Sequence, residues 1–160
     1  MSNCCQVPAP EPQGVVSCPV RGSKGKPVEL QTVKALLTEH ALRRVGTSEH
    51  RFCPQPDCHV VYFDAAGNQY TKADVRVPVW DKEPFGERMV CYCFGENEAS
   101  IRVEIERHGR SDAVGRVRQH IQAGRCACEV RNPRGVCCLG DVTAAVKRVA
   151  LSLQSVEADA

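Results

Sequence analysis

The stretch RCACEVRNPRGVCCLGDV, residues 125–142, carries four of the eleven cysteines of this 160-residue chain. A further pair, Cys91-Tyr92-Cys93, precedes it, so that six thiols fall within 48 residues. The sulfurs of a C-x-C or C-C pair are poorly placed to form a disulfide with each other, but they chelate metal readily. A [2Fe-2S] cluster takes four thiolates, two on each iron. The pattern therefore predicts an iron–sulfur unit in the second half of the chain.

Six thiols compete for the four ligand positions of such a cluster. Cys91 and Cys93 flank one residue, so a loop entering a helix can direct both sulfurs to one site. The other two ligands come from the remaining four cysteines, Cys126, Cys128, Cys137 and Cys138. Residues 132–135, Asn-Pro-Arg-Gly, are typical of a turn, which would bring Cys128 near Cys137 or Cys138. Such a turn also exposes backbone N–H groups that can donate to cluster sulfurs.

A second group of thiols, in the first half, indicates zinc. Cys53 and Cys58 enclose a Pro-Gln-Pro-Asp turn just ahead of the apolar run 60–63, as in a zinc knuckle. Cys18 completes a set of three. We expect the fourth ligand to come from Cys4, Cys5, Asp57, His59 or the other unit, and we favour Cys5.

Disulfides or free thiols are the alternative to metal ligation. The odd count and the closeness of the pairs argue against disulfides. Residues 1–17 show neither the basic nor the apolar region of a secretory signal, so we expect a cytoplasmic protein. No apolar run approaches the ~20 residues of a membrane helix. The formal net charge of +2 and the eight aromatic residues give no nucleic-acid footprint, and no hydrolase or phosphate-loop motif occurs.

The chain is expected to be α+β, with a small treble-clef-like zinc-binding unit followed by a helical [2Fe-2S] unit. Residues 1–17, rich in Cys and Pro, form a flexible N-terminus, residues 18–80 the zinc unit, residues 81–89 a linker, and residues 90–155 the cluster unit. In the zinc unit, residues 21–27 are expected to be a loop. The spacing of apolar residues predicts a helix of about four turns over 28–42. Short antiparallel strands are predicted at 60–63 and 75–79.

Helices dominate the prediction for the second unit. Residues 101–105 alternate as a strand would, but Asn97 and its acidic neighbours suit a helix start, and we favour a helix. Val114, Val117 and Ile121 predict a second helix ended by Gly124. A last helix is predicted from Val142 to Leu153.

Three segments together resemble the N-terminal zinc and [2Fe-2S] domain of CopZ-type copper chaperones: FCPQPDCHVVYF at 52–63, VCYCFG at 90–95 and RCACEVRNPRGVCCLGDV at 125–142. The resemblance covers roughly residues 15–145. The second half is also similar to the [2Fe-2S] domain of bacterioferritin-associated ferredoxin, whose later C-x-x-C spacing would place a ligand at Glu129. The fourth ligand must therefore come from the N-P-x-G-x-C-C insertion.

The resemblance implies cluster ligation by Cys91, Cys93, Cys128 and Cys138, with Cys126 and Cys137 as alternates. It assigns zinc to Cys18, Cys53 and Cys58. Two-domain CopZ-type proteins also carry a copper-binding domain with an M-x-C-x-x-C loop, and residues 1–160 contain no such loop.

The cysteine groups favour a redox-active metallochaperone or metal-resistance accessory protein. Its cluster would pass one electron to Cu(II), and thiolates would hold Cu(I) or another soft ion such as Hg(II). The pair Cys4-Cys5 is the candidate delivery site. A copper or other soft-metal transport protein, or an electron donor, is the expected partner. The alternatives are a ferredoxin-like one-electron carrier and a zinc-only binding module.

Overall fold

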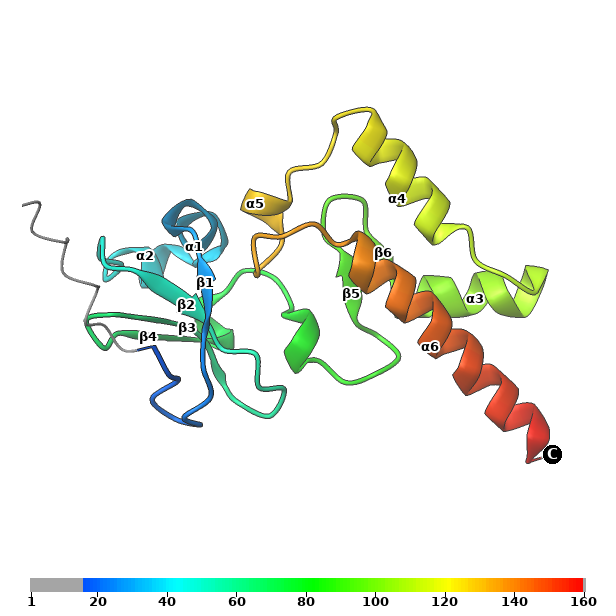
Figure 1. The fold of residues 1–160 in the computed structure, drawn as a ribbon, viewed down its shortest axis with the longest axis horizontal. Helices are drawn as coiled ribbons and strands as arrows, with labels where there is room; N and C mark the ends of the chain where they lie inside the picture. The colour runs from blue at the N-terminus through cyan, green and yellow to red at the C-terminus, as the bar shows by residue number, and fades with distance from the viewer. Residues whose placement is uncertain (1–15, 160) are drawn as a thin grey trace, which may run out of the picture.

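The computed structural model describes residues 16–159, which form two adjoining halves (Figure 1). We call residues 16–79 the sheet half and residues 80–159 the helix half. Each half has its own hydrophobic core, and the division falls between Val79, which packs in the first core, and Trp80, which packs in the second. None of the described helices is long and apolar enough to cross a lipid bilayer.

A four-stranded antiparallel sheet in the order β1-β2-β3-β4 organises the sheet half. Its strands are β1 (Lys26–Val28), β2 (His50–Phe52), β3 (Val60–Asp64) and β4 (Gln69–Thr71). Every residue of β3 is buried, because Val61 and Tyr62 pack in the main core while Val60 and Phe63 pack against cysteines. The continuous apolar run 60–63 is thus a strand covered on both faces, which confirms the prediction there.

The predicted helix over 28–42 is wrong as one element, because the chain breaks it at Leu37 and Thr38. It forms α1 (Leu30–Leu36) and α2 (Glu39–Leu42), and Thr38 caps α2 by accepting from the Ala41 N–H at 3.3 Å. Leu37 is extended and pairs with Val75. Both short helices contribute buried side chains to the core of the sheet half, Val33 and Leu36 from α1 and Ala41 from α2.

The predicted strand at 75–79 and the predicted loop at 21–27 also need correction. Thr71 and Asp74 form a capping box that turns the chain into a 3-10 turn over Lys72–Asp74, and only Val75 then makes a strand-like bridge. The strand that pairs with β3 on the side away from β2 is β4, and not residues 75–79. Part of the predicted loop is β1, which extends the sheet beyond β2.

Four helices and a small hairpin build the helix half: β5 (Met89–Cys91), β6 (Glu96–Asn97), α3 (Glu98–His108), α4 (Ala113–Gln122), α5 (Cys128–Arg131) and α6 (Leu139–Ala158). Residues 101–105 are helical, as favoured, because Asn97 and Ser100 form a capping box at the start of α3. The helices predicted around 114–121 and 142–153 are confirmed as α4 and α6. The sequence did not predict the hairpin or α5. α6 packs against both α3 and α4 (Figure 1).

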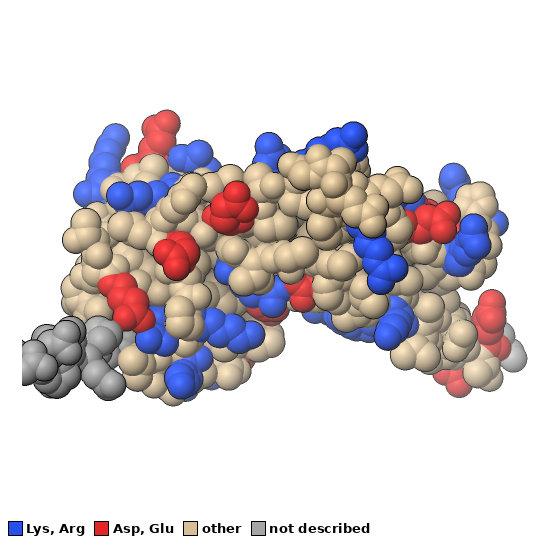
Figure 2. Space-filling model, turned by 45° about the horizontal axis from the view of Figure 1, so that its top comes forward, with Lys and Arg blue, Asp and Glu red and all other residues tan. Residues whose placement is uncertain are grey.

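The segment predicted as a linker, residues 81–89, is held against the helix half. Glu98, fully buried, accepts from the Gly86 N–H at 2.6 Å and pairs with the Arg88 guanidinium at 3.3 Å. Arg88 and Arg148 both lie over the Trp80 ring, at 4.7 and 5.2 Å from its centroid. On the face shown in Figure 2, basic and acidic side chains are interspersed over both halves.

Candidate metal centres

The sheet half brings Cys18, Cys53 and Cys58 together, and all three are buried. Their Sγ atoms lie within 4.8 Å of one another, and the Sγ atoms of Cys18 and Cys58 are 3.8 Å apart. A tetrahedral zinc ion with Zn–S bonds of about 2.3 Å holds its thiolates about 3.8 Å apart. The donor set and its spacing therefore fit zinc.

The sheet fixes the positions of these thiols. Cys53 directly follows β2, and its N–H donates to the Val61 carbonyl at 2.9 Å, while Cys58 lies two residues before β3. Cys18 begins a turn closed by a hydrogen bond from the Gly22 N–H to the Cys18 carbonyl at 2.7 Å. Two strands and one turn thus converge on the three sulfurs.

The surroundings shift the pKa values of Cys58 and Cys18 in opposite directions. Burial favours the neutral thiol and raises the pKa of Cys58. Burial acts in the same sense on Cys18, but the backbone N–H groups of Arg21 and Val20 outweigh it, and the pKa of Cys18 is lowered. Cys18 is thus biased toward the thiolate form that binds metal.

Lys82 reaches this site from the helix half. Its side chain is buried, and its ammonium donates to the Gln55 carbonyl of the knuckle at 2.7 Å. Burial lowers the pKa of Lys82, and the charges of Cys53 and Cys58 act in the opposite direction. One zinc ion with three thiolates carries a net negative charge, which an ammonium group in this position offsets.

Two of the predicted candidates for the fourth zinc ligand, Asp57 and His59, do not lie with the trio. Asp57 pairs with Arg21 at 2.7 Å and its side chain is 67% exposed, while His59 is also exposed. Neither offers a ligand atom within 4.8 Å of all three sulfurs. Cys4 and Cys5 lie outside the described residues. Within residues 16–159, the trio supplies three of the four positions.

In the helix half, the four expected cluster ligands lie as two sulfur pairs. The Sγ atoms of Cys93 and Cys128 are 3.8 Å apart, and Cys91 and Cys138 lie close enough to shift each other's pKa values. A [2Fe-2S] cluster places two thiolates on each of its two irons. The donor type and the paired arrangement therefore fit such a cluster.

Three elements carry these thiols. Cys91 ends β5, Cys128 begins α5, and Cys138 is the residue that precedes α6. The Ala127 N–H donates to Cys93 Sγ at 3.3 Å. A backbone N–H donor and the amino end of a long helix both stabilise negative charge on sulfur.

Cys91 and Cys138 shift each other's pKa values in opposite directions. The hydrogen bond from Cys138 lowers the pKa of Cys91 to about 7, and the same bond raises the pKa of Cys138. Burial raises the pKa of Cys128 to about 12. Cys91 is therefore biased toward the thiolate form relative to Cys128 and Cys138.

Cys126 and Cys137, the alternates, occupy the edge of the group. Cys126 is partly buried and Cys137 is exposed. Among residues 16–159, the sulfur–sulfur hydrogen bonds join Cys18 with Cys58 and Cys93 with Cys128, and involve neither of these two thiols. Cys126 and Cys137 therefore belong to neither of the two sulfur pairs.

The turn between Cys128 and Cys138 is held by its own side chains. The Asn132 side chain accepts from the Arg134 N–H at 3.0 Å and donates to the Val136 carbonyl at 2.9 Å. Arg134 in turn pairs with Asp141 at the start of α6. These bonds fix the path of the loop that the sequence predicted as a turn.

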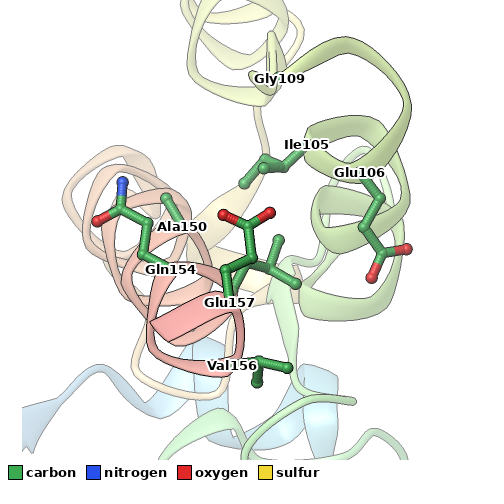
Figure 3. Close-up of a pocket in the computed structure, with 8 residues that line it drawn as sticks. Ile105, Glu106, Gly109, Ala150, Gln154, Val156 and Glu157 are labelled. Carbon is green, nitrogen blue, oxygen red and sulfur yellow. The ribbon is translucent and has the colours of Figure 1, made fainter. Parts of the chain in front are cut away.

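A surface hollow of about 580 Å³ lies elsewhere, between α3 and α6 (Figure 3). Ile105 and Val156 give it an aliphatic lining, and the carboxylates of Glu106 and Glu157 lie beside it. It contains no cysteine. The thiol groups remain the candidate sites.

Comparisons with known proteins agree with this geometry. Residues 15–76 match the CopZ family model described as a zinc binding domain. The N-terminal domain of CopZ from Archaeoglobus fulgidus, solved by X-ray crystallography, is 30% identical in sequence and superposes with a TM-score of 0.62 over 76% of this chain and 91% of that one. The chain belongs to the CopZ N-terminal domain family. This confirms the predicted resemblance, and the first half carries the zinc binding domain of that family. Comparison with curated proteins gave no match.

Sequence reasoning missed two residues near these sites, Lys82 and Tyr62. Lys82 lies in the predicted linker, where a lysine is expected in solvent. Tyr62 lies within an apolar run and reads as a core residue. No local signal distinguishes either one, because each meets its partner across a long stretch of chain.

Proposed function

We propose that this CopZ-like protein is a zinc- and [2Fe-2S]-containing metallochaperone that reduces Cu(II) and retains Cu(I). The observation that carries the proposal is the presence of two separate thiol groups with different arrangements, a buried trio in the sheet half and two largely buried pairs in the helix half. The predicted unit 18–80 would hold zinc, and the predicted unit 90–155 would hold the cluster. The ligands would be Cys18, Cys53 and Cys58 for zinc, and Cys91, Cys93, Cys128 and Cys138 for the cluster.

The two metal groups would have different tasks, electron transfer for the cluster and structural stabilisation for zinc. A bound [2Fe-2S] cluster supplies one electron at a time, which is the electron count of Cu(II) reduction to Cu(I). The paired thiols and the Ala127 N–H hold negative charge in a largely buried site. An external one-electron donor would restore the electron after each turnover. Zinc, which has no redox chemistry, would stabilise the sheet half.

Copper enters this scheme as the substrate. Cu(I) is a soft ion and prefers thiolate ligands. Cys4 and Cys5 are the candidate delivery pair, because they are adjacent in the sequence and offer two thiols to one soft ion. The expected partner is a copper or other soft-metal transport protein that receives the ion, together with the electron donor.

A reducing compartment suits this chemistry, and we propose the cytoplasm. All nine cysteines among residues 16–159 are free thiols, although several lie close together. Such thiols persist where glutathione and thioredoxin keep them reduced.

The test is to add Cu(II) to anaerobically reduced, desalted protein and to compare the wild type with a Cys4→Ser/Cys5→Ser variant. We expect both proteins to regain the visible bands of the oxidised cluster on copper addition. Only the wild type should keep Cu(I) after a second desalting step at the full stoichiometry. Equal copper retention by the two proteins would contradict the delivery role of the pair. Reoxidation without any copper retention by the wild type would instead indicate a one-electron carrier.

A further inference from the structure

The loop between Cys128 and Cys138 rests on the sheet half rather than on its own half alone. The Tyr62 hydroxyl of β3 donates to the Pro133 carbonyl at 2.5 Å, in a buried contact between residues 71 positions apart. Thr32 of α1 donates to the Glu129 carbonyl at 2.6 Å. In Figure 1, α5 lies beside α1, and the two helices are in contact.

Tyr62 lies on β3 and pairs directly with Phe52, the last residue of β2. Cys53 directly follows β2. Cys58 lies four residues before Tyr62, at the entry to β3. The Cys53 N–H donates to the carbonyl of Val61 at 2.9 Å, so the trio is hydrogen-bonded to the residue that precedes Tyr62, and the Tyr62 hydroxyl reaches the opposite half.

The hydrogen bond to Pro133 is the polar contact that the Tyr62 hydroxyl makes. The side chain is fully buried, and burial raises the pKa of the Tyr62 hydroxyl, so that it stays protonated and donates. Pro133, also buried, has no N–H of its own, and its carbonyl would lack this donor if the hydroxyl were removed. The bond therefore fixes the middle of the loop at a defined distance from β3.

We propose that Tyr62 is a positioning residue that holds the cluster-binding loop from the zinc-binding sheet, so that the spacing of Cys128 and Cys138 depends on the sheet half. This inference rests on the proposed function only for the cluster, since the positioning of the loop itself requires no metal. The Tyr62 hydroxyl makes no contact with a proposed ligand and acts through Pro133.

The test replaces Tyr62 by Phe in the full chain and uses Tyr70→Phe as the matched control. Tyr70 is equally buried and lies on the neighbouring strand β4, but its hydroxyl donates to the Arg44 carbonyl within the sheet half, at 3.3 Å. In Tyr62→Phe we expect amide hydrogen exchange over residues 128–138 to accelerate about 5- to 30-fold, with zinc content unchanged. In Tyr70→Phe, exchange in this segment should stay at the wild-type rate.

Two cluster measurements complete the test. Loss of iron to a chelator should accelerate by a similar factor in Tyr62→Phe, and the midpoint potential should shift, because the donors around the sulfurs move. Equal exchange in residues 128–138 for Tyr62→Phe and Tyr70→Phe would overturn the inference. If the wild type binds no iron, the proposed function fails, and the exchange measurement on the zinc-loaded protein still decides the role of Tyr62.

Discussion

Replacing Gly135 by alanine tests the close approach of the turn to α1. Gly135 has a φ of +67°, and a Cβ built at this position would lie 2.7 Å from Thr32 Oγ1 and 3.2 Å from Thr32 Cγ2. Thr32 is 1% exposed, and its Oγ1 donates to the Glu129 carbonyl, so the side chain has little room to withdraw. The added methyl group must therefore displace α1, the turn, or both.

The expected cost has two sources. A non-glycine residue in the left-handed region costs about 1–2 kcal/mol. Forcing an extra carbon into a packed contact costs about 1–3 kcal/mol more. Gly109 offers the matched control, because its φ is +75° and a Cβ added there would have no neighbouring atom within 4 Å. Gly109→Ala should therefore show the backbone cost alone, about 1–2 kcal/mol.

The assay is urea-induced unfolding followed by far-ultraviolet circular dichroism, on metal-loaded protein under anaerobic conditions. Gly135→Ala should lower the free energy of unfolding by about 1–3 kcal/mol more than Gly109→Ala does. Thr32→Ala should reduce this excess when combined with Gly135→Ala, with a coupling energy of about 1 kcal/mol or more. Equal destabilisation by the two glycine substitutions, without coupling to Thr32, would refute the close contact between the turn and α1.

Three further predictions address the zinc site and the helix half. Cys58→Ser should reduce bound zinc from about one ion per chain to a small fraction, while Cys137→Ser keeps it, as elemental analysis can show. Lys82→Met should weaken zinc binding about tenfold in a competition assay with a chromogenic chelator, because the buried ammonium group near the zinc site is lost. An unchanged zinc affinity would exclude this electrostatic role of Lys82. Glu98→Gln should lower the free energy of unfolding by about 3 kcal/mol, because it leaves the largely buried Arg88 without its charged partner. A urea titration measures this loss. A loss below about 1 kcal/mol would show that solvent compensates the Arg88 charge.

Local sequence signals predicted the elements that form from neighbouring residues. The apolar run 60–63 forms a buried strand, Asn97 starts α3, and the Asn-Pro-Arg-Gly segment forms a turn. The trio of Cys18, Cys53 and Cys58 could also be anticipated, because chelating spacing and the strand that follows Cys58 are both visible in the sequence. For the strand, the helix start and the turn, the physical cause lies within a few residues, whereas the fold brings Cys18 to the other two thiols.

The features that the sequence did not predict depend on tertiary contacts. The helix breaks at Leu37 because an extended residue there can pair with Val75, which is 38 positions away. The contacts of Tyr62 with Pro133 and of Lys82 with Gln55 likewise join distant segments. Such pairings depend on how the two halves pack, and the side chains involved read locally as a core tyrosine and a solvent lysine. The assignment of individual cysteines to the cluster stays a prediction for the same reason, since six thiols lie in one region.

Metal content together with the visible absorption spectrum of anaerobically purified protein tests the central claim most directly. The account predicts about two irons and one zinc per chain, with cluster bands that bleach when dithionite is added. Zinc without iron or colour, in protein that was never exposed to oxygen, would contradict it and would indicate a zinc-only binding module.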